Sequence, residues 1–179
     1  MAFDIGNILQ QYLGAGAGQS LGQGQNPNQL NDDFDQITNS VPRAQVAQGM
    51  TEALRSDQTP PFPQMVGQMF GNSNPSQRAG MLNQLLASIG PGLLSSIAGG
   101  ALGNILGGNR NTTPQITPEQ AAQITPEQAE ELATRAEQEN PTVVDRLGDF
   151  YAENPTLVKA IGGAALAIVL GRVAQGMQR

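Results

Sequence analysis

Residues 116–129 read ITPEQAAQITPEQA, so the motif Ile-Thr-Pro-Glu-Gln-Ala occurs twice with an offset of eight residues. In each copy a threonine, Thr117 or Thr125, precedes a proline and stands three positions before a glutamine. This pattern is a capping box, in which the threonine hydroxyl accepts a hydrogen bond from a free backbone N–H and the proline occupies the first helical position. The stretch therefore predicts a one-turn helix and then a longer helix that runs to about Gln138.

A second repeat predicts two more helices nearer the C-terminus. Residues 139–144 read ENPTVV and residues 153–158 read ENPTLV. Each asparagine is a favourable N-cap, and each following proline fits the first helical position. We expect Phe150 and Tyr151 to form the aromatic core of this half, and the second helix to run from Pro155 towards the C-terminus.

The N-terminal half contains shorter helical patterns. Residues 3–13 predict an amphipathic helix, whereas residues 14–29, GAGAGQSLGQGQNPNQ, hold too little apolar surface to fold alone and predict a flexible linker. Polar residues that favour helix capping precede further runs of apolar residues at helical spacing. The residues predicted to start these helices are Asp32, Asp33, Ser40 and Asn74.

Together these patterns predict an all-α fold, in which short amphipathic and Gly/Ala-rich helices are joined by linkers rich in Gly, Gln, Asn and Pro. Along the sequence we expect an N-terminal helix and flexible linker at residues 1–30, and a helical region with an uncharged Gly-rich segment at residues 31–109. A short linker at residues 110–116 precedes a C-terminal helical region at residues 117–179, whose last helix is hydrophobic.

Two rows of small residues are spaced four positions apart, which places each row along one face of a helix. Small side chains allow a second helix backbone to approach closely, as in glycine-spaced helix pairs in membranes. A tightly packed helix pair in a soluble protein, or a loose Gly-rich loop, is the alternative interpretation of such a row. The residues predicted to mediate helix packing or assembly are Ser95, Gly99, Gly103, Gly107, Gly163, Ala167 and Gly171.

The charge pattern bears on membrane association. Ionisable side chains are absent from residues 79–109, a run of 31 residues, but polar residues and Pro91 interrupt it before either part reaches about 20 apolar residues. A hairpin or an interfacial helix therefore fits better than two full spans. Residues 160–171 form a shorter uncharged stretch, whose length favours a buried or amphipathic helix over a membrane span that ends at Lys159 and Arg172.

Composition excludes several kinds of chemistry. The chain has no Cys and no His, which removes thiolate and imidazole nucleophiles, bases and metal ligands. One Lys and eight scattered Arg do not make a basic surface for nucleic acid. The acidic cluster at Asp32, Asp33 and Asp35 lacks the glycine and glutamate positions of a calcium-binding EF-hand loop, so helix capping is the better interpretation. We therefore predict no enzymatic activity, no catalytic residue, no metal or cofactor, and no small-molecule substrate.

One part of the chain resembles a known family. Residues 70–86, FGNSNPSQRAGMLNQLL, and residues 85–108, LLASIGPGLLSSIAGGALGNILGG, follow a short opening helix and a Gly-rich linker. In this respect residues 1–109 resemble the YidB-like bacterial proteins of unknown function. The resemblance implies a bacterial, all-helical, non-enzymatic protein. The C-terminal repeats fall outside it, and it transfers no functional residue.

Three functional hypotheses follow. The first is a structural protein that forms homo-oligomers or associates with a membrane through its small-residue helix faces. The second is a soluble helical adaptor, in which the same faces are interior contacts between the two halves of the chain. Pore formation by the Gly-rich helices is a minor third. Because the N-terminus lacks the basic residues of a secretory signal, we expect a cytoplasmic location, with possible membrane association.

Overall fold

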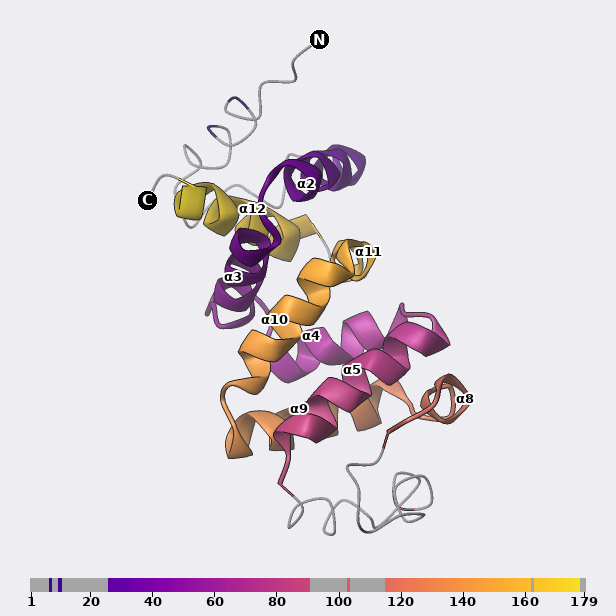
Figure 1. Ribbon diagram of the computed structural model, residues 1–179. Helices are drawn as coiled ribbons and strands as arrows, with labels where there is room; N and C mark the ends of the chain where they lie inside the picture. The colour runs from indigo at the N-terminus through magenta and orange to yellow at the C-terminus, as the bar shows by residue number, and fades with distance from the viewer. Residues whose placement is uncertain are drawn as a thin grey trace. The chain divides into compact units, whose positions relative to one another are not determined.

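The computed structural model describes residues 26–90, 115–161 and 163–177, together with the single positions 7, 10 and 103 (Figure 1). Residues in these ranges form helices, turns and bends without a strand, which confirms the all-α prediction. The predicted helix at residues 3–13, most of the predicted linker at residues 14–29, and residues 91–114 except Gly103 lie outside the described residues. The helices in chain order are α2 (Pro27–Ser40), α3 (Arg43–Leu54), α4 (Phe62–Gly71), α5 (Pro75–Ser88), α8 (Pro118–Ala121), α9 (Pro126–Glu139), α10 (Val143–Glu153), α11 (Pro155–Val158), the 3₁₀ turn η1 (Lys159–Ile161) and α12 (Gly163–Met177).

The chain divides into two compact units. Unit 1 comprises Met1–Pro61 and Gly148–Arg179, and unit 2 comprises Phe62–Leu147. Each unit draws on both halves of the sequence, so the segments 31–109 and 117–179 are each divided between the two units. The second boundary falls inside α10, which is one continuous helix.

Unit 1 is built around α12. This helix packs along α3 and also against α2, and Figure 1 shows the three helices side by side. Their apolar faces meet at helical spacing, and burying one such side chain stabilises the fold by about 1.5–3 kcal/mol. The buried side chains at the centre of unit 1 include Leu30, Phe34, Ile37, Val46, Met50, Leu54, Tyr151, Leu157, Leu166, Val169, Leu170 and Val173.

Unit 2 pairs α4 with α9, and α5 with both α8 and α9. The side chain of Arg78 on α5 donates hydrogen bonds to the carbonyl oxygens of Phe70 and Gly71, at 2.9 and 3.0 Å, at the end of α4. The buried side chains of this unit include Phe62, Met65, Val66, Met69, Phe70, Met81, Leu82, Leu85, Leu86, Leu132, Val143 and Leu147.

The predicted capping boxes are confirmed at both copies of the motif. The Thr117 and Thr125 hydroxyls accept hydrogen bonds from the backbone N–H groups of Gln120 and Gln128, at 3.4 and 3.3 Å. Both glutamine side chains bond back to their threonine N–H at 3.0 Å. As predicted, the first copy starts the one-turn helix α8 and the second starts the longer helix α9.

Two predicted helix starts are wrong. Helix α2 begins at Pro27, because Asn26 is its N-cap and accepts a hydrogen bond from the Asn28 N–H at 3.2 Å. Asp32 and Asp33 therefore lie inside α2 rather than at its start. The predicted linker ends earlier than expected because burial of Leu30 and Phe34 against the rest of unit 1 stabilises this first turn.

The second wrong start is Ser40, which is the last residue of α2. Helix α3 starts at Arg43 after Pro42, without a side-chain cap. The predicted start at Asn74 is confirmed, since Asn74 and Gln77 form a full capping box at the head of α5.

The ENPT repeat behaves differently in its two copies. Asn140 accepts hydrogen bonds from the Thr142 N–H and hydroxyl, at 3.1 and 2.6 Å, but regular α10 starts only at Val143. Asn154 makes no side-chain cap for α11, and instead donates to the carbonyl of Phe150 at 2.9 Å, which helps to end α10.

The final helix is interrupted, so the prediction of one helix from Pro155 is wrong. Helix α11 gives way to the 3₁₀ turn η1, and α12 starts at Gly163. The sequence has two successive glycines at 162–163, and glycine lowers helix stability by about 1 kcal/mol per residue relative to alanine.

The prediction that Phe150 and Tyr151 form an aromatic core is partly confirmed. Tyr151 is fully buried, and Phe150 is half-buried with its ring 5.9 Å from that of Tyr151 in an edge-on arrangement.

Candidate functional site

The C-terminal row of small residues lies in α12, and its central member faces the interior. Ala167 has an exposed fraction of 0%, while Gly163 and Gly171 are half-buried. A Cβ atom added to Gly163 would lie 3.2 Å from Cδ1 of Leu30 on α2. The row therefore contributes to packing within unit 1.

The other predicted row falls almost wholly outside the described residues. Ser95, Gly99 and Gly107 are not described, and Gly103 is helical and half-buried. The contacts of this row are therefore not part of the site that the structure defines.

The closest helix contacts involve glycines that the sequence analysis did not single out. A Cβ atom on Gly49 of α3 would lie 2.5 Å from Val173 Cγ2 and 3.1 Å from the Val173 backbone nitrogen on α12. On Gly148 of α10, it would lie 2.3 Å from Thr51 Oγ1 and 3.2 Å from the Ala47 carbonyl oxygen. At both positions the β-branched side chain of Val173 or Thr51 occupies the space that a methyl group would take, and backbone atoms 3.1–3.3 Å away limit how far the helices can shift.

Unit 2 contains a similar contact at Gly67 on α4, where a Cβ atom would lie 3.3 Å from the Pro126 carbonyl oxygen on α9. A sequence signal for these contacts exists. Each of the three glycines has a small residue four positions later, and these pairs are Gly49 with Ala53, Gly67 with Gly71, and Gly148 with Ala152. Single pairs of this kind are less conspicuous than the two longer rows of small residues.

Helix α12 contains most of the uncharged stretch at residues 160–171, for which a membrane span was one of the interpretations. It has 15 residues, fewer than the roughly 20 apolar residues that cross a bilayer, and it includes Arg172. Among the described helices, none has both the length and the apolar content needed to cross a membrane. Among the described residues of the stretch 160–171, Ile161, Leu166, Ala167, Val169 and Leu170 are buried within unit 1.

Polar contacts join helices from opposite halves of the sequence in both units. The Lys159 ammonium donates to the Asp35 carboxylate on α2, and Arg172 lies 3.8 Å from the Glu52 carboxylate. In unit 2 the Asn83 side chain pairs with the backbone of Ile116. Its Oδ1 accepts from the Ile116 N–H at 2.7 Å, and its Nδ2 donates to the Ile116 carbonyl at 3.2 Å. Asn83 thus satisfies both backbone hydrogen-bonding groups of Ile116.

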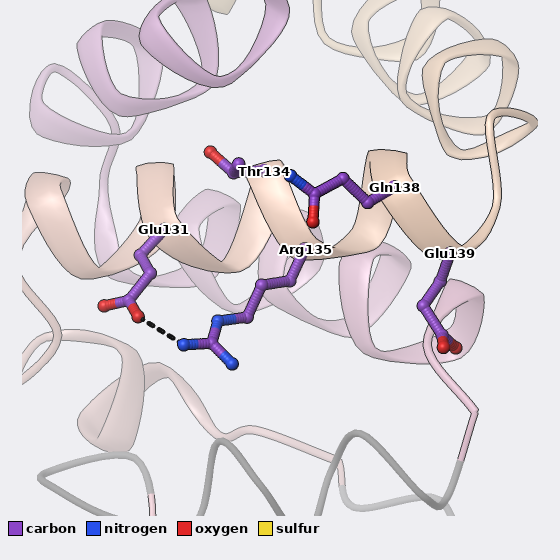
Figure 2. A pocket seen from close by; sticks show the side chains of 5 residues that line it. All are labelled: Glu131, Thr134, Arg135, Gln138 and Glu139. Atoms are coloured by element: carbon purple, nitrogen blue, oxygen red, sulfur yellow. Dashed lines mark hydrogen bonds and ion pairs between the residues drawn. The ribbon is translucent and has the colours of Figure 1, made fainter.

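A shallow depression lies on the polar face of α9 (Figure 2). Its main interaction is an ion pair between Glu131 and Arg135, 2.9 Å apart, whose side chains are 65% and 39% exposed. Such an exposed pair contributes about 0.2–1 kcal/mol. All the lining residues come from this one helix: Glu131, Thr134, Arg135, Gln138 and Glu139. A surface of this kind offers hydrogen bonds and charges of both signs, but it does not surround a ligand.

The ionisable groups with shifted pKa values occupy structural positions. Hydrogen bonds from their own backbone N–H groups, and then from Thr117 and Thr125, lower the pKa values of Glu119 and Glu127 at the starts of α8 and α9. Burial raises the pKa of the Tyr151 hydroxyl. In the described part of the chain, Asp and Glu residues do not gather into a group of three or more that could hold a metal ion.

The resemblance of residues 1–109 to the YidB-like proteins stays a prediction. No protein-family model matches the chain, and comparison with curated proteins and with solved structures finds no similar protein.

Proposed function

We propose that the chain is a non-enzymatic helical adaptor, a protein that binds other proteins through its exterior while its small-residue helix faces hold its own helices together. The observation that supports this proposal is the inward position of the α12 row. Ala167 has no exposed surface, and Gly163 lies against Leu30 of the same molecule. While unit 1 is formed within one molecule, Ala167 offers no surface for contact with a second molecule.

The exterior of α9 is the surface that this proposal assigns to a partner. It carries carboxylates, a guanidinium, a hydroxyl and an amide on one exposed helix face. Polar faces of this type form the rims of protein interfaces, where complementary charges set orientation and association rate. The expected partner is a protein surface with charges complementary to Glu131 and Arg135.

The first experiment is flotation of the full-length protein with lipid vesicles, followed by light scattering on the fraction that stays in solution. The adaptor proposal predicts that the protein does not float and that dilute samples contain monomers. It also predicts that Gly163→Leu lowers the thermal midpoint without changing particle mass, because the added side chain meets Leu30 within the molecule. Flotation, or a large particle that Gly163→Leu dissociates, would contradict it.

Self-assembly or membrane association through Ser95, Gly99, Gly103 and Gly107 is the second candidate. Their four-residue spacing within a 31-residue uncharged stretch supports it, and Gly103 is helical. If this row mediates assembly, Gly103→Leu abolishes flotation or dissociates the oligomer. Gly100→Leu, which adds the same bulk off the row, does not. Equal behaviour of the two variants would exclude this candidate.

A further inference from the structure

The principal helix pairs in the described residues join the N-terminal half of the chain to its C-terminal half. In unit 1, α2 and α3 pack on α12. In unit 2, α4 packs on α9, and α5 packs on α8 and α9. In each pair, one helix precedes residue 91 and the other follows residue 114. Residues 26–90 therefore rely on residues 115–177 to cover their apolar faces.

The tightest contacts at the described glycines cross the same divide. Gly49 meets Val173, Gly67 meets Pro126, and Gly148 meets Ala47 and Thr51. These contacts require complementary shapes on the two halves, since a methyl group at Gly49 or Gly148 would overlap the facing helix.

Polar contacts across the divide add specificity. The Asp35–Lys159 and Glu52–Arg172 pairs place an acid on the N-terminal half opposite a base on the C-terminal half. Asn83 binds the backbone of Ile116 through two hydrogen bonds, at 2.7 and 3.2 Å. Each unit thus contains its own complementary contacts between the same two segments of the chain.

We infer that the two halves, residues 26–90 and 115–177, are exchangeable docking partners, so that the N-terminal half of one copy pairs with the C-terminal half of a second copy. Every contact described above is made equally well within one molecule or between two, and reciprocal exchange closes a two-fold dimer. The partner is a second copy of this chain. The inference is independent of the proposed adaptor function, because it concerns the chain's own interior contacts.

The length of the connection decides which arrangement prevails. Residues 91–114 supply 24 residues, which extended would reach roughly 80 Å. A connection of this length permits pairing within one molecule, at an effective concentration on the order of millimolar. Pairing within one molecule therefore dominates in dilute solution, and exchange dominates when the connection becomes too short.

The first test joins Gly90 directly to Gln115 by deleting residues 91–114. Helix α5 ends at Ser88, about 7.5 Å beyond Asn83 at 1.5 Å per residue, and Ile89 continues in an extended conformation towards Gly90, whereas the two peptide bonds from Gly90 back to Ile116 span only about 7 Å. One molecule therefore loses the Asn83–Ile116 bonds, while two molecules keep them. The expected product is a dimer with the circular dichroism per helical residue of the full chain, and light scattering measures its mass.

The matched control replaces residues 91–114 by a Gly/Ser linker of the same length. It is expected to be a monomer in dilute solution, which assigns dimer formation to the length of the connection rather than to its sequence. A deletion variant that is monomeric, whether helical or unfolded, would overturn the inference if the control folds.

The second test uses full-length chains and does not depend on the deletion variant folding. One copy carries Asp35→Lys and Glu52→Arg, and the other carries Lys159→Glu and Arg172→Glu. Each copy alone places like charges opposite each other in unit 1. In a reciprocal dimer, the N-terminal half of the first copy meets the C-terminal half of the second, so both ion pairs form with their charges reversed. The two remaining halves carry the native residues and form the two native ion pairs. All four ion pairs are therefore attractive.

The two copies carry different tags and are refolded together at equal, high concentrations. The fraction of dimers that contain both tags then measures the preference for mixed dimers over like dimers. The inference predicts that the ratio of mixed dimers to like dimers rises from its random value of 1:1 by roughly threefold to tenfold, and that the excess falls in high salt, as expected for exposed ion pairs. Native-charge copies with the same two tags give the random proportion. An absence of mixed dimers, or a random proportion of them from the charge variants, would overturn the inference.

Discussion

Gly49 lies on α3 at a point where a side chain would enter space occupied by Val173 of α12. We predict that Gly49→Ala lowers the free energy of unfolding by about 1–3 kcal/mol, because a Cβ atom there would lie 2.5 Å from Val173 Cγ2 and 3.1 Å from a backbone nitrogen. The backbone contact limits how far the structure can relax. Urea denaturation followed by circular dichroism measures the change.

Gly176 is the matched control, since it lies in α12 and a Cβ atom there would have no neighbour within 4 Å. Gly176→Ala is expected to raise the free energy of unfolding by up to about 1 kcal/mol through helix propensity alone. If the two substitutions changed stability equally, the close approach of α3 and α12 would be refuted.

Asn83 is the second residue whose role depends on geometry. We predict that Asn83→Ala lowers the free energy of unfolding by about 1–3 kcal/mol, because the backbone N–H and C=O of buried Ile116 lose their side-chain partner. Asn72→Ala is the comparison, since the Asn72 side chain makes one exposed hydrogen bond to the Gln68 carbonyl. Denaturant unfolding measures the difference in stability between the two variants. The midpoints are compared at equal slopes of unfolding free energy against denaturant concentration. Equal midpoints would contradict the proposed role of Asn83.

At the scale of the element, the two capping boxes make the starts of α8 and α9 sensitive to pH. The pKa values of Glu119 and Glu127 are lowered, so these groups contribute stability above the carboxyl pKa of the unfolded chain and lose it as pH falls through their folded values. We predict that Thr125→Ala lowers the free energy of unfolding by about 1 kcal/mol at neutral pH.

Thr125→Ala is also expected to weaken the acid dependence that Glu127 contributes, because the Thr125 hydroxyl is one cause of the lowered pKa. Carbon-detected NMR titration of the Glu127 carboxyl would show its midpoint move towards the ordinary glutamate value. An unchanged midpoint would show that the backbone N–H alone sets it. Thr156→Ala, which lies outside both capping boxes, is expected to leave the titration midpoint of Glu127 unchanged.

Local patterns predicted the elements better than they predicted the links between them. Capping boxes at Asn74, Thr117 and Thr125 involve residues three positions apart, so their geometry follows from sequence spacing alone. The early start of α2 could not be predicted in this way, because it depends on which apolar faces unit 1 buries, and that is a tertiary property. The break before α12 does have a local signal, the two glycines at 162–163, which the prediction of one continuous helix did not use.

The candidate site was predicted less well for the same reason. Spacing identified Gly163, Ala167 and Gly171 as one face of a helix, but it did not indicate whether that face meets the chain itself or another molecule. Gly49 and Gly148 were missed because their importance comes from Val173 and Thr51, which are far away in sequence. A pattern within one helix carries no information about which helix it faces.

Tyr151 makes the stability of the folded protein depend on pH in the alkaline range. Burial raises the pKa of its hydroxyl, so the group contributes stability below the unfolded value of about 10, and that stability is lost as pH rises through the folded value. We predict that the thermal midpoint falls more steeply above pH 10 in the native chain than in Tyr151→Phe. Identical slopes for the two proteins would show that Tyr151 does not control this loss.

The pairing of N-terminal helices with C-terminal helices also affects synthesis on the ribosome. When α3 and α5 are synthesised, the helices that cover them, α12, α8 and α9, have not yet been translated. At about 5–20 residues per second, the delay between residue 90 and residue 177 is roughly 5–20 s. During that interval the nascent chain exposes Met50, Leu82 and other core side chains, which makes it a client for chaperones that bind apolar segments until translation is complete.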